Sequence, residues 1–377
     1  MSSTNSPASG VPGEESQPPH VVENCLGVLQ VYSDGTVKRV PPPLVLHQDD
    51  AALPDDSSPV KWKDVVYDEA NKLSLRMFAP SAGGGGRGEK LPVLVCFFHG
   101  GGFVVGTFAM PDFHALCLRL AAELPAVVLS ADYRLAPEHR LPAAHEDAWS
   151  VLSWLRAQAA TATTDPWLAE TADFRRVFVS GDSAGANIAH HAAVRIGSGD
   201  LPVEPARVAG CVLLWPYFGG EERTPSEAAC PADAFLTLAL YDQMWRIALP
   251  VGAARDHPAA NPFGSGSRGL DDAVNLPSML VATGDRDMLV DRIRDYVARL
   301  KAAGKQVELV EFAGQAHAFA VFKPESEDAA ELVASCGGSC TAAAQHSRAC
   351  EPERSGLGLL VLARRLVTLA RADCRAA

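Results

Sequence analysis

The sequence lacks any long uninterrupted apolar run. A helix that crosses a bilayer needs about 20 consecutive, mostly apolar residues, and the nearest candidate, residues 356–370, is interrupted by Arg364 and Arg365. Residues 1–20 also lack the basic start and apolar centre of a signal peptide. Their Ser, Pro and Gly content predicts a disordered lead-in instead. We therefore expect no membrane span.

Positive charge is also in short supply. The chain carries 33 Lys and Arg against 45 Asp and Glu, so its formal net charge is −12 at pH 7. Nucleic acids and anionic membrane surfaces attract proteins through positively charged patches. The charge balance argues against both classes of partner and favours an ordinary solvated surface.

The cysteines form neither a disulfide framework nor a metal-binding pattern. Nine are spread along the chain, whereas small secreted domains carry even sets at regular spacing. Cys336 and Cys340 lie close together, but no second pair at zinc-ligand spacing accompanies them. We expect reduced thiols in a cytoplasmic protein that binds no metal and needs no cofactor.

Apolar runs alternate with helical patterns from residue 93 onward. Continuous apolar runs indicate strands buried on both faces, as in a parallel sheet. Such a run covers 93–98, an apolar strand follows at 126–130, and further strands are predicted over 177–180, 208–215, 278–283 and 307–312. Helical spacing covers 113–124, 144–158, 184–196 and 291–303. This alternation predicts one α/β domain with a mostly parallel central sheet flanked by helices.

Two segments break the alternation. Residues 219–275 are rich in Pro and Gly with helical fragments, and an insertion beside the functional edge of a sheet predicts a lid. Residues 335–356 have little apolar periodicity, which predicts a mobile loop. Helical spacing returns over 357–370. That last segment either docks as part of a closing helix or never docks at all.

A glycine-flanked serine follows the predicted strand 177–180. The sequence Gly-Asp-Ser-Ala-Gly at 181–185 is a G-x-S-x-G turn between a strand and a helix. Such a turn holds its serine in a strained conformation with the hydroxyl exposed above the sheet. We predict that Ser183 is a nucleophile. The competing interpretation is a serine that only caps the following helix.

A second glycine motif, His-Gly-Gly-Gly-Phe at 99–103, follows the predicted strand 93–98. It matches the loop that lends backbone N–H groups to an oxyanion hole in lipases and esterases. We expect His99 to brace this loop rather than to transfer protons. The N–H groups assigned to the oxyanion hole are those of Gly101, Gly102 and Ala184, with Gly100 as a possible substitute.

A hydrolase with this serine turn needs its acid and its base later in the chain, in the order Ser, Asp, His. His317 follows the strand 307–312 in a loop, where such sites gather, whereas His346 lies in the irregular tail. His190 and His191 lie on the helix after the serine and are predicted to pack there. His317 is therefore the predicted base.

Three aspartates after the strand 278–283 compete for the role of the acid. Asp291 is well placed to cap the next helix. Asp287 is the preferred candidate to orient His317 and stabilise its protonated ring, and Asp285 is second.

Aromatic residues beside these motifs are candidates for a substrate pocket, although each could equally be a core residue. Phe103 and Phe319 are the stronger ones, because each lies within four residues of a predicted site residue. The others are Trp215, Tyr217 and Phe218.

Taken together, the motifs resemble the plant carboxylesterases of the hormone-sensitive-lipase-like group, which also includes the gibberellin receptors. The resemblance covers about residues 21–334 and rests on 27–35, 99–103, 132–139, 142–149, 181–185 and 216–220. It implies an α/β-hydrolase fold and hydrolysis of small-molecule esters through an acyl-enzyme formed by Ser183, His317 and Asp287. Asp287 is favoured because the family's acid opens an Asp-x-Leu-x-Asp pattern, here ending at Asp291. The resemblance also implies that the segment 21–60 helps to build the lid.

Two other functions stay open within this family. The gibberellin receptors lack the catalytic histidine, which this chain has at His317. The 2-hydroxyisoflavanone dehydratases keep much of the machinery; some carry threonine in place of the serine, and others keep it. We rank the esterase first, the receptor second and the dehydratase third. The resemblance ends after Ala334, so 335–377 is an atypical C-terminal segment.

Overall fold

A computed structural model describes residues 18–40, 59–81, 90–124, 126–161, 164–268 and 272–349. The predicted lead-in over 1–20 lies outside these ranges except for its last three residues, and the helical segment predicted over 357–370 lies wholly outside them. Within the described ranges, none of the helices is both long enough and apolar enough to span a bilayer.

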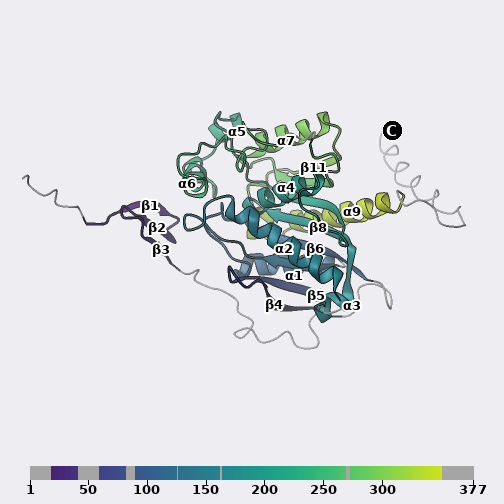
Figure 1. The fold of residues 1–377 in the computed structure, drawn as a ribbon. Helices are drawn as coiled ribbons and strands as arrows, with labels where there is room; N and C mark the ends of the chain where they lie inside the picture. Colours follow the sequence, from purple (N-terminus) through teal and green to yellow (C-terminus); the bar gives the residue numbers. More distant parts are fainter. Residues whose placement is uncertain are drawn as a thin grey trace, which may run out of the picture.

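A mixed sheet of eight strands forms the centre of the molecule (Figure 1). The strands lie in the order β11-β10-β9-β8-β6-β7-β5-β4. From β11 to β7 they run parallel, and β5 is antiparallel to both of its neighbours. The predicted α/β-hydrolase fold with a mostly parallel sheet is confirmed. The strands are β4 (Val60–Asp68), β5 (Leu73–Pro80), β6 (Leu91–Phe98), β7 (Val127–Ala131), β8 (Ala172–Asp182), β9 (Val208–Leu214), β10 (Ser278–Gly284) and β11 (Val307–Phe312).

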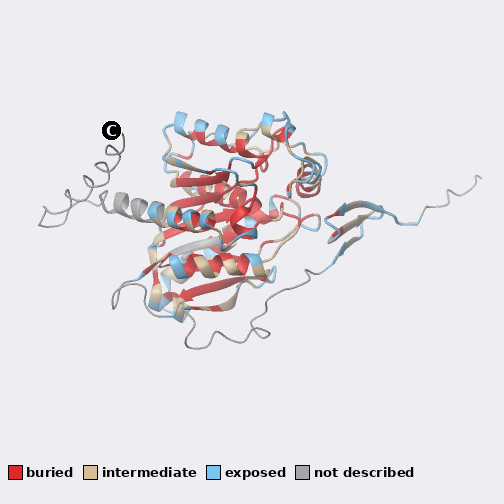
Figure 2. Ribbon diagram, turned by 180° about the vertical axis from the view of Figure 1, so that it is seen from behind, coloured by how far each residue is buried: buried red, intermediate tan, exposed pale blue. Residues whose placement is uncertain are grey.

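Helices cover both faces of this sheet, which is why its inner strands are apolar without alternation. Neighbouring residues of β7, Val128 and Leu129, are both fully buried but belong to different hydrophobic clusters, one on each face. Figure 2 shows the strands buried between helices whose outer sides are exposed. One face carries α1 (Pro111–Glu123), α8 (Phe319–Phe322) and α9 (Glu327–Ala349), and the other carries α2 (Ala143–Ala160), α4 (Ala184–Gly197) and α7 (Val290–Ala302). The short helix α3 (Pro166–Thr171) leads into β8.

A separate antiparallel sheet lies beside the insertion. It contains β1 (Val21–Cys25), β2 (Leu29–Tyr32) and β3 (Val37–Arg39), and Figure 1 places it at the end of the molecule that carries α6 (Leu238–Ala248). Glu23 pairs with Arg246 of α6 at 2.6 Å, and Arg39 pairs with Glu138 at 2.7 Å. The N-terminal segment and the insertion therefore lie side by side, which a lid built from both requires.

The C-terminal segment differs from the prediction. The sequence predicts a mobile loop over 335–356, but α9 continues through residues 335–349, so the loop prediction is wrong there. Ala329, Leu332, Val333 and Cys336 form a buried stripe of this helix. Burial of that stripe offsets the two glycines at 337 and 338, each of which costs a helix about 1 kcal/mol relative to Ala. The rest of the predicted loop lies outside the described residues.

Candidate active site

Ser183 sits at the sharp turn between β8 and α4. Its backbone has φ 52° and ψ −114°, a region that non-glycine residues rarely adopt. Its N–H donates to the carbonyl of Leu214 at 2.9 Å, which ties the turn to the end of β9. The glycines on either side are required by close approach: a Cβ on Gly181 would lie 2.3 Å from the backbone of Gly185, and one on Gly185 would lie 1.8 Å from the Phe98 carbonyl oxygen.

The structure brings Ser183, His317 and Asp287 together. The Ser183 Oγ lies 2.9 Å from Nε2 of His317, and Nδ1 of the same ring lies 2.7 Å from Oδ2 of Asp287. All three side chains are buried, and the second carboxylate oxygen of Asp287 accepts the Leu289 N–H at 2.9 Å. Each side chain follows the carboxyl end of a parallel strand, because β8, β10 and β11 end at the same edge of the sheet.

The competing candidates lie elsewhere. Asp285 is exposed and accepts the Gly314 N–H at 2.7 Å, while Asp291 accepts the Ser226 N–H at 2.8 Å. His190 and His191 pack on α4 beneath the site, as predicted from their place on the helix. His346 lies on α9, in a part whose side chains are not described.

The residues predicted to form an oxyanion hole come from two segments beside the serine. Gly100, Gly101 and Gly102 line the same cavity as Ser183. Ala184 is the first residue of α4, so its N–H has no carbonyl partner within the helix. His99 lies below the loop, with its ring stacked on Tyr133 at 4.4 Å and Nδ1 2.7 Å from the Gly100 carbonyl oxygen. These contacts make His99 a brace for the glycine loop.

Asp182 is a polar side chain of the site that the sequence analysis did not single out. It lies next to Ser183, lines the cavity and is buried. Burial raises the pKa of its carboxyl from 3.8 to about 6, against the opposing effects of His99, His317 and the Gly100 N–H. Its position inside the serine motif was visible in the sequence, but its burial depends on the fold.

A cavity of about 500 Å³ opens above the serine. Its other walls come from the N-terminal segment, with Leu26, Val28 and Arg39, and from α6, with Leu240 and Met244. Ligand pockets for drug-sized molecules have volumes of roughly 300–1,000 Å³. The cavity therefore has room for far more than an acetyl group.

Only one of the predicted pocket aromatics borders this cavity. Tyr217 lines it, but Phe103, Trp215, Phe218 and Phe319 do not, so these four predictions are wrong. All four are nearly fully buried in the packing around the site; Phe103 lies against Trp245 at 5.6 Å and Phe319 against Trp215 at 5.2 Å. Phe113, Phe235 and Phe322 line the cavity instead. Distance along the chain did not reveal which way each ring points.

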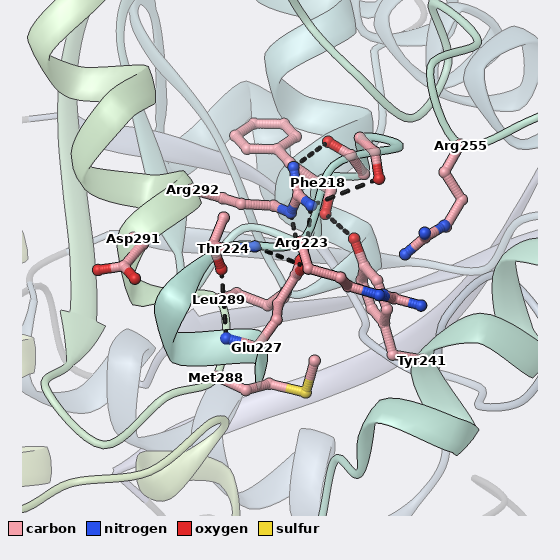
Figure 3. A network of polar contacts seen from close by, with 12 residues as sticks. Phe218, Arg223, Thr224, Glu227, Tyr241, Arg255, Met288, Leu289, Asp291 and Arg292 are labelled. Carbon is pink, nitrogen blue, oxygen red and sulfur yellow. Dashed lines mark hydrogen bonds and ion pairs between the residues drawn. The ribbon is translucent and has the colours of Figure 1, made fainter. Parts of the chain in front are cut away.

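A short helix of the insertion is bonded to the loop that carries Asp287 (Figure 3). This helix, α5 (Pro225–Ala228), presents Ser226, whose hydroxyl donates to the Met288 carbonyl at 2.8 Å. The next residue, Glu227, is fully buried and pairs with Arg292 of α7, with Nη2 2.9 Å from Oε2. Arg292 also donates to the carbonyl of Gly219 at 3.1 Å. The loop from Asp287 to Asp291 is therefore held between α5 and α7.

Comparisons with known proteins agree with this fold. A family model described as alpha/beta hydrolase fold matches residues 95–321. Carboxylesterase 20 of Arabidopsis thaliana is 37% identical over 268 residues, which cover 69% of this chain and 80% of that protein. A 2-hydroxyisoflavanone dehydratase of Glycyrrhiza echinata is 35% identical over 320 residues, 81% of this chain and 92% of the relative. Among solved structures, an esterase of Pyrobaculum calidifontis matches with a TM-score of 0.62 at 30% identity and covers 75% of this chain and 85% of its own.

Proposed function

The chain belongs to the α/β-hydrolase family that contains the plant carboxylesterases, and from that premise we propose how it hydrolyses carboxylic esters of small molecules. The observation that carries the mechanism is the continuous hydrogen-bonded line from Ser183 through His317 to Asp287. A serine hydroxyl is a weak nucleophile until a neighbouring base removes its proton, and this line supplies the base and the group that orients it.

In the first half of the reaction, the Ser183 Oγ attacks the ester carbonyl carbon while Nε2 of His317 takes the hydroxyl proton. Asp287 stabilises the imidazolium that forms. The N–H groups of Gly101, Gly102 and Ala184 hold the carbonyl oxygen as it becomes negative. His317 then returns the proton to the departing alkoxide, so an alcohol leaves and the acyl group stays on Ser183.

In the second half, a water molecule replaces the alcohol. His317 removes a proton from the water, which attacks the acyl carbon and forms a second oxyanion in the same hole. Collapse of that intermediate breaks the acyl bond to Ser183, whose oxygen recovers its proton from His317. The carboxylic acid leaves, and the site returns to its starting state without a cofactor.

Two other activities in the family are weaker candidates. A receptor needs no proton transfer at Ser183, yet here its hydroxyl is bonded to a histidine that is itself bonded to a buried carboxylate. The similarity to a 2-hydroxyisoflavanone dehydratase keeps loss of water from a flavonoid as the second candidate. Incubation with a 2-hydroxyisoflavanone tests this directly, because the dehydrated product is absent for an esterase.

The test uses p-nitrophenyl butyrate and follows the initial burst and the steady state. Replacement of Ser183 by Ala removes the nucleophile and should lower kcat by on the order of 10⁴ or more. Asp287→Asn should lower kcat by about 10⁴, because the amide no longer stabilises the imidazolium. Asp285→Asn is the matched control and should stay near the wild type. An active Ser183→Ala enzyme would disprove the mechanism.

We also propose a cytoplasmic location and no partner other than the ester. In support, the cysteines with described surroundings, Cys25, Cys117, Cys211, Cys230 and Cys336, carry free thiols. The acidic charge argues against nucleic acid. Fractionation of plant cells with an antibody to this chain tests the location, and recovery in an organelle fraction would contradict it.

A further inference from the structure

Two aromatic side chains at the rim of the cavity are left exposed. Phe235 is 57% exposed and Phe322 is 47% exposed, and their rings meet edge-to-face with centroids 4.5 Å apart. Single exposed apolar residues are common and need no explanation. A contacting pair that also lines the active-site cavity is different, because a ligand in the cavity would cover both rings.

The pair joins two parts of the molecule that are far apart in the sequence. Phe235 belongs to the insertion 219–275, just before α6, whereas Phe322 ends α8, which begins two residues after His317. Met110 and Phe113 at the start of α1, a helix that contacts α8, line the cavity as well. The aromatic pair therefore belongs to a cavity with further apolar and aromatic lining.

Charge in the cavity selects against anions. Arg39 is the only Lys or Arg among the described residues that line it. The Arg39 guanidinium is already bound to the Glu138 carboxylate and to the carbonyls of Val104 and Ala136. Asp112 and Asp182 line the cavity as well. A carboxylate on the substrate would meet two acidic residues and no free cation.

We propose that Phe235 and Phe322 form a subsite for an aromatic ring, and that the preferred substrates are neutral esters carrying an aryl group. A ring seated against their exposed faces can adopt the edge-to-face and offset arrangements that aromatic pairs favour. Phe235 and Phe322 then determine specificity. This inference rests on the proposed ester hydrolysis and names its substrate class.

The experiment compares matched esters without an aromatic reporter, with hydrolysis followed by proton release. Ethyl 3-phenylpropionate against ethyl butyrate tests an aryl group on the acyl side, and benzyl acetate against ethyl acetate tests one on the alcohol side. Monobenzyl succinate against benzyl butyrate tests the carboxylate. The wild type should prefer the aryl member of at least one of the first two pairs and should hydrolyse monobenzyl succinate at least tenfold less efficiently than benzyl butyrate.

The variants are Phe235→Ala, Phe322→Ala and the double variant. Each single change should lower the ratio of kcat/KM for the aryl ester over its alkyl partner by about 3- to 10-fold, the size expected for one aromatic contact. The losses should not add in the double variant, because the two rings touch. Val251→Ala is the control: Val251 is 87% exposed and does not line the cavity, so the ratio should not change.

The outcomes separate this inference from the proposed function. An aryl-to-alkyl ratio that is the same in wild type and both variants would overturn the subsite, and so would equal turnover of monobenzyl succinate and benzyl butyrate. Those results leave ester hydrolysis intact. Failure of ester hydrolysis itself would appear as a wild type no faster than Ser183→Ala on every ester. Titration with an organophosphate counts the intact serines in each variant, so a misfolded variant is recognised before ratios are compared.

Discussion

At the scale of single residues, the site depends on backbone positions that only glycine fills well. Gly101 has φ +109°, and a Cβ there would lie 2.0 Å from the Val105 carbonyl oxygen. That oxygen cannot move away easily, because it belongs to the backbone of the same loop. A side chain at position 101 would therefore displace the loop that forms the proposed oxyanion hole.

Gly101→Ala should therefore lower kcat by about 10²–10³, the loss expected when one oxyanion donor is displaced. The matched control is Gly252→Ala, whose φ of +82° carries a similar backbone strain but whose Cβ would meet nothing within 4 Å. Gly252→Ala should lose on the order of 1–2 kcal/mol of stability from the left-handed conformation, and Gly101→Ala should lose more, because its Cβ also meets the backbone of Val105. Steady-state kinetics beside urea unfolding separates the two effects. Equal kcat values for the two variants would contradict the assignment.

Asp182 provides a prediction with a defined pH dependence. Burial raises its pKa from 3.8 to about 6. Between these two pH values, the native state holds a proton on Asp182 that the unfolded chain has released. Stability from this group is complete below pH 3.8 and is lost as the pH rises through 6. The difference between the two pKa values corresponds to on the order of 3 kcal/mol.

Replacement of Asp182 by Asn removes this titration. The free energy of unfolding of the variant, relative to that of the wild type, should therefore rise from pH 4 to pH 8 by on the order of 3 kcal/mol. Urea unfolding at both pH values measures the change. A stability difference that does not vary with pH would mean that the Asp182 carboxyl is not buried as described.

At the scale of elements, the insertion does more than border the cavity. Glu227 of α5 and Arg292 of α7 form a buried ion pair, and Figure 3 shows this pair near Met288 and Leu289 of the loop that follows Asp287. Thr224 caps α5, with its hydroxyl accepting the Glu227 N–H at 3.2 Å. The insertion thus contacts the loop that carries the proposed acid through the Ser226 hydroxyl, which donates to the Met288 carbonyl.

Glu227→Ala leaves Arg292 buried without its carboxylate, and removal of one partner from a buried pair costs about 3–5 kcal/mol. The control is an exposed ion pair that uses the same helix, α7. Arg294 of this helix pairs with Glu311 of β11 at 2.6 Å, and Arg294 is 47% exposed. Glu311→Ala should cost no more than about 1 kcal/mol. Urea unfolding compares the two, and kcat should fall only in Glu227→Ala, because only that change loosens the acid loop. Similar losses for both would refute the role of the buried pair.

The predictions from sequence succeeded where one local pattern determines the outcome. Strands such as β7 and β9 were located from apolar runs, since a strand covered on both faces must be apolar throughout. The glycine motifs located Ser183 and the proposed oxyanion loop, because each motif is a short run of residues that can be recognised in the sequence itself. Patterns that depend on distant packing were less informative: a mobile loop was predicted from residue 335 onward, where α9 continues instead, because the buried stripe of this helix packs against the sheet. The directions of Phe103 and Phe319 depend on the same kind of packing.

At the scale of the whole molecule, the parallel sheet brings the site residues to one edge, and a group of histidines gathers where α4 packs against α2. His145 and His190 are buried and His191 is half-buried; the ring of His191 lies 4.1 Å from that of His145 and 5.1 Å from that of His190. Neutral partners hold them: Asn187 faces His145 at 3.0 Å, and the Tyr296 hydroxyl faces His190 at 2.8 Å. Two of these rings, His190 and His191, belong to α4 itself, and His145 of α2 contacts His191.

Burial lowers the pKa of all three histidines, that of His191 from 6.5 to about 4, with further lowering from neighbouring histidines including His257. Unfolded histidines gain a proton as the pH falls below 6.5, whereas the buried rings resist it. Stability is thus complete above pH 6.5 and is lost as the pH falls toward 4, by up to about 1.4 kcal/mol per pH unit for each ring. His191→Gln should make the fall between pH 6.5 and 4 shallower by about one proton, as measured by urea unfolding across the range. His139→Gln, at an exposed position, should leave the slope unchanged, and an unchanged slope in His191→Gln would show that this ring already carries its proton in the native state.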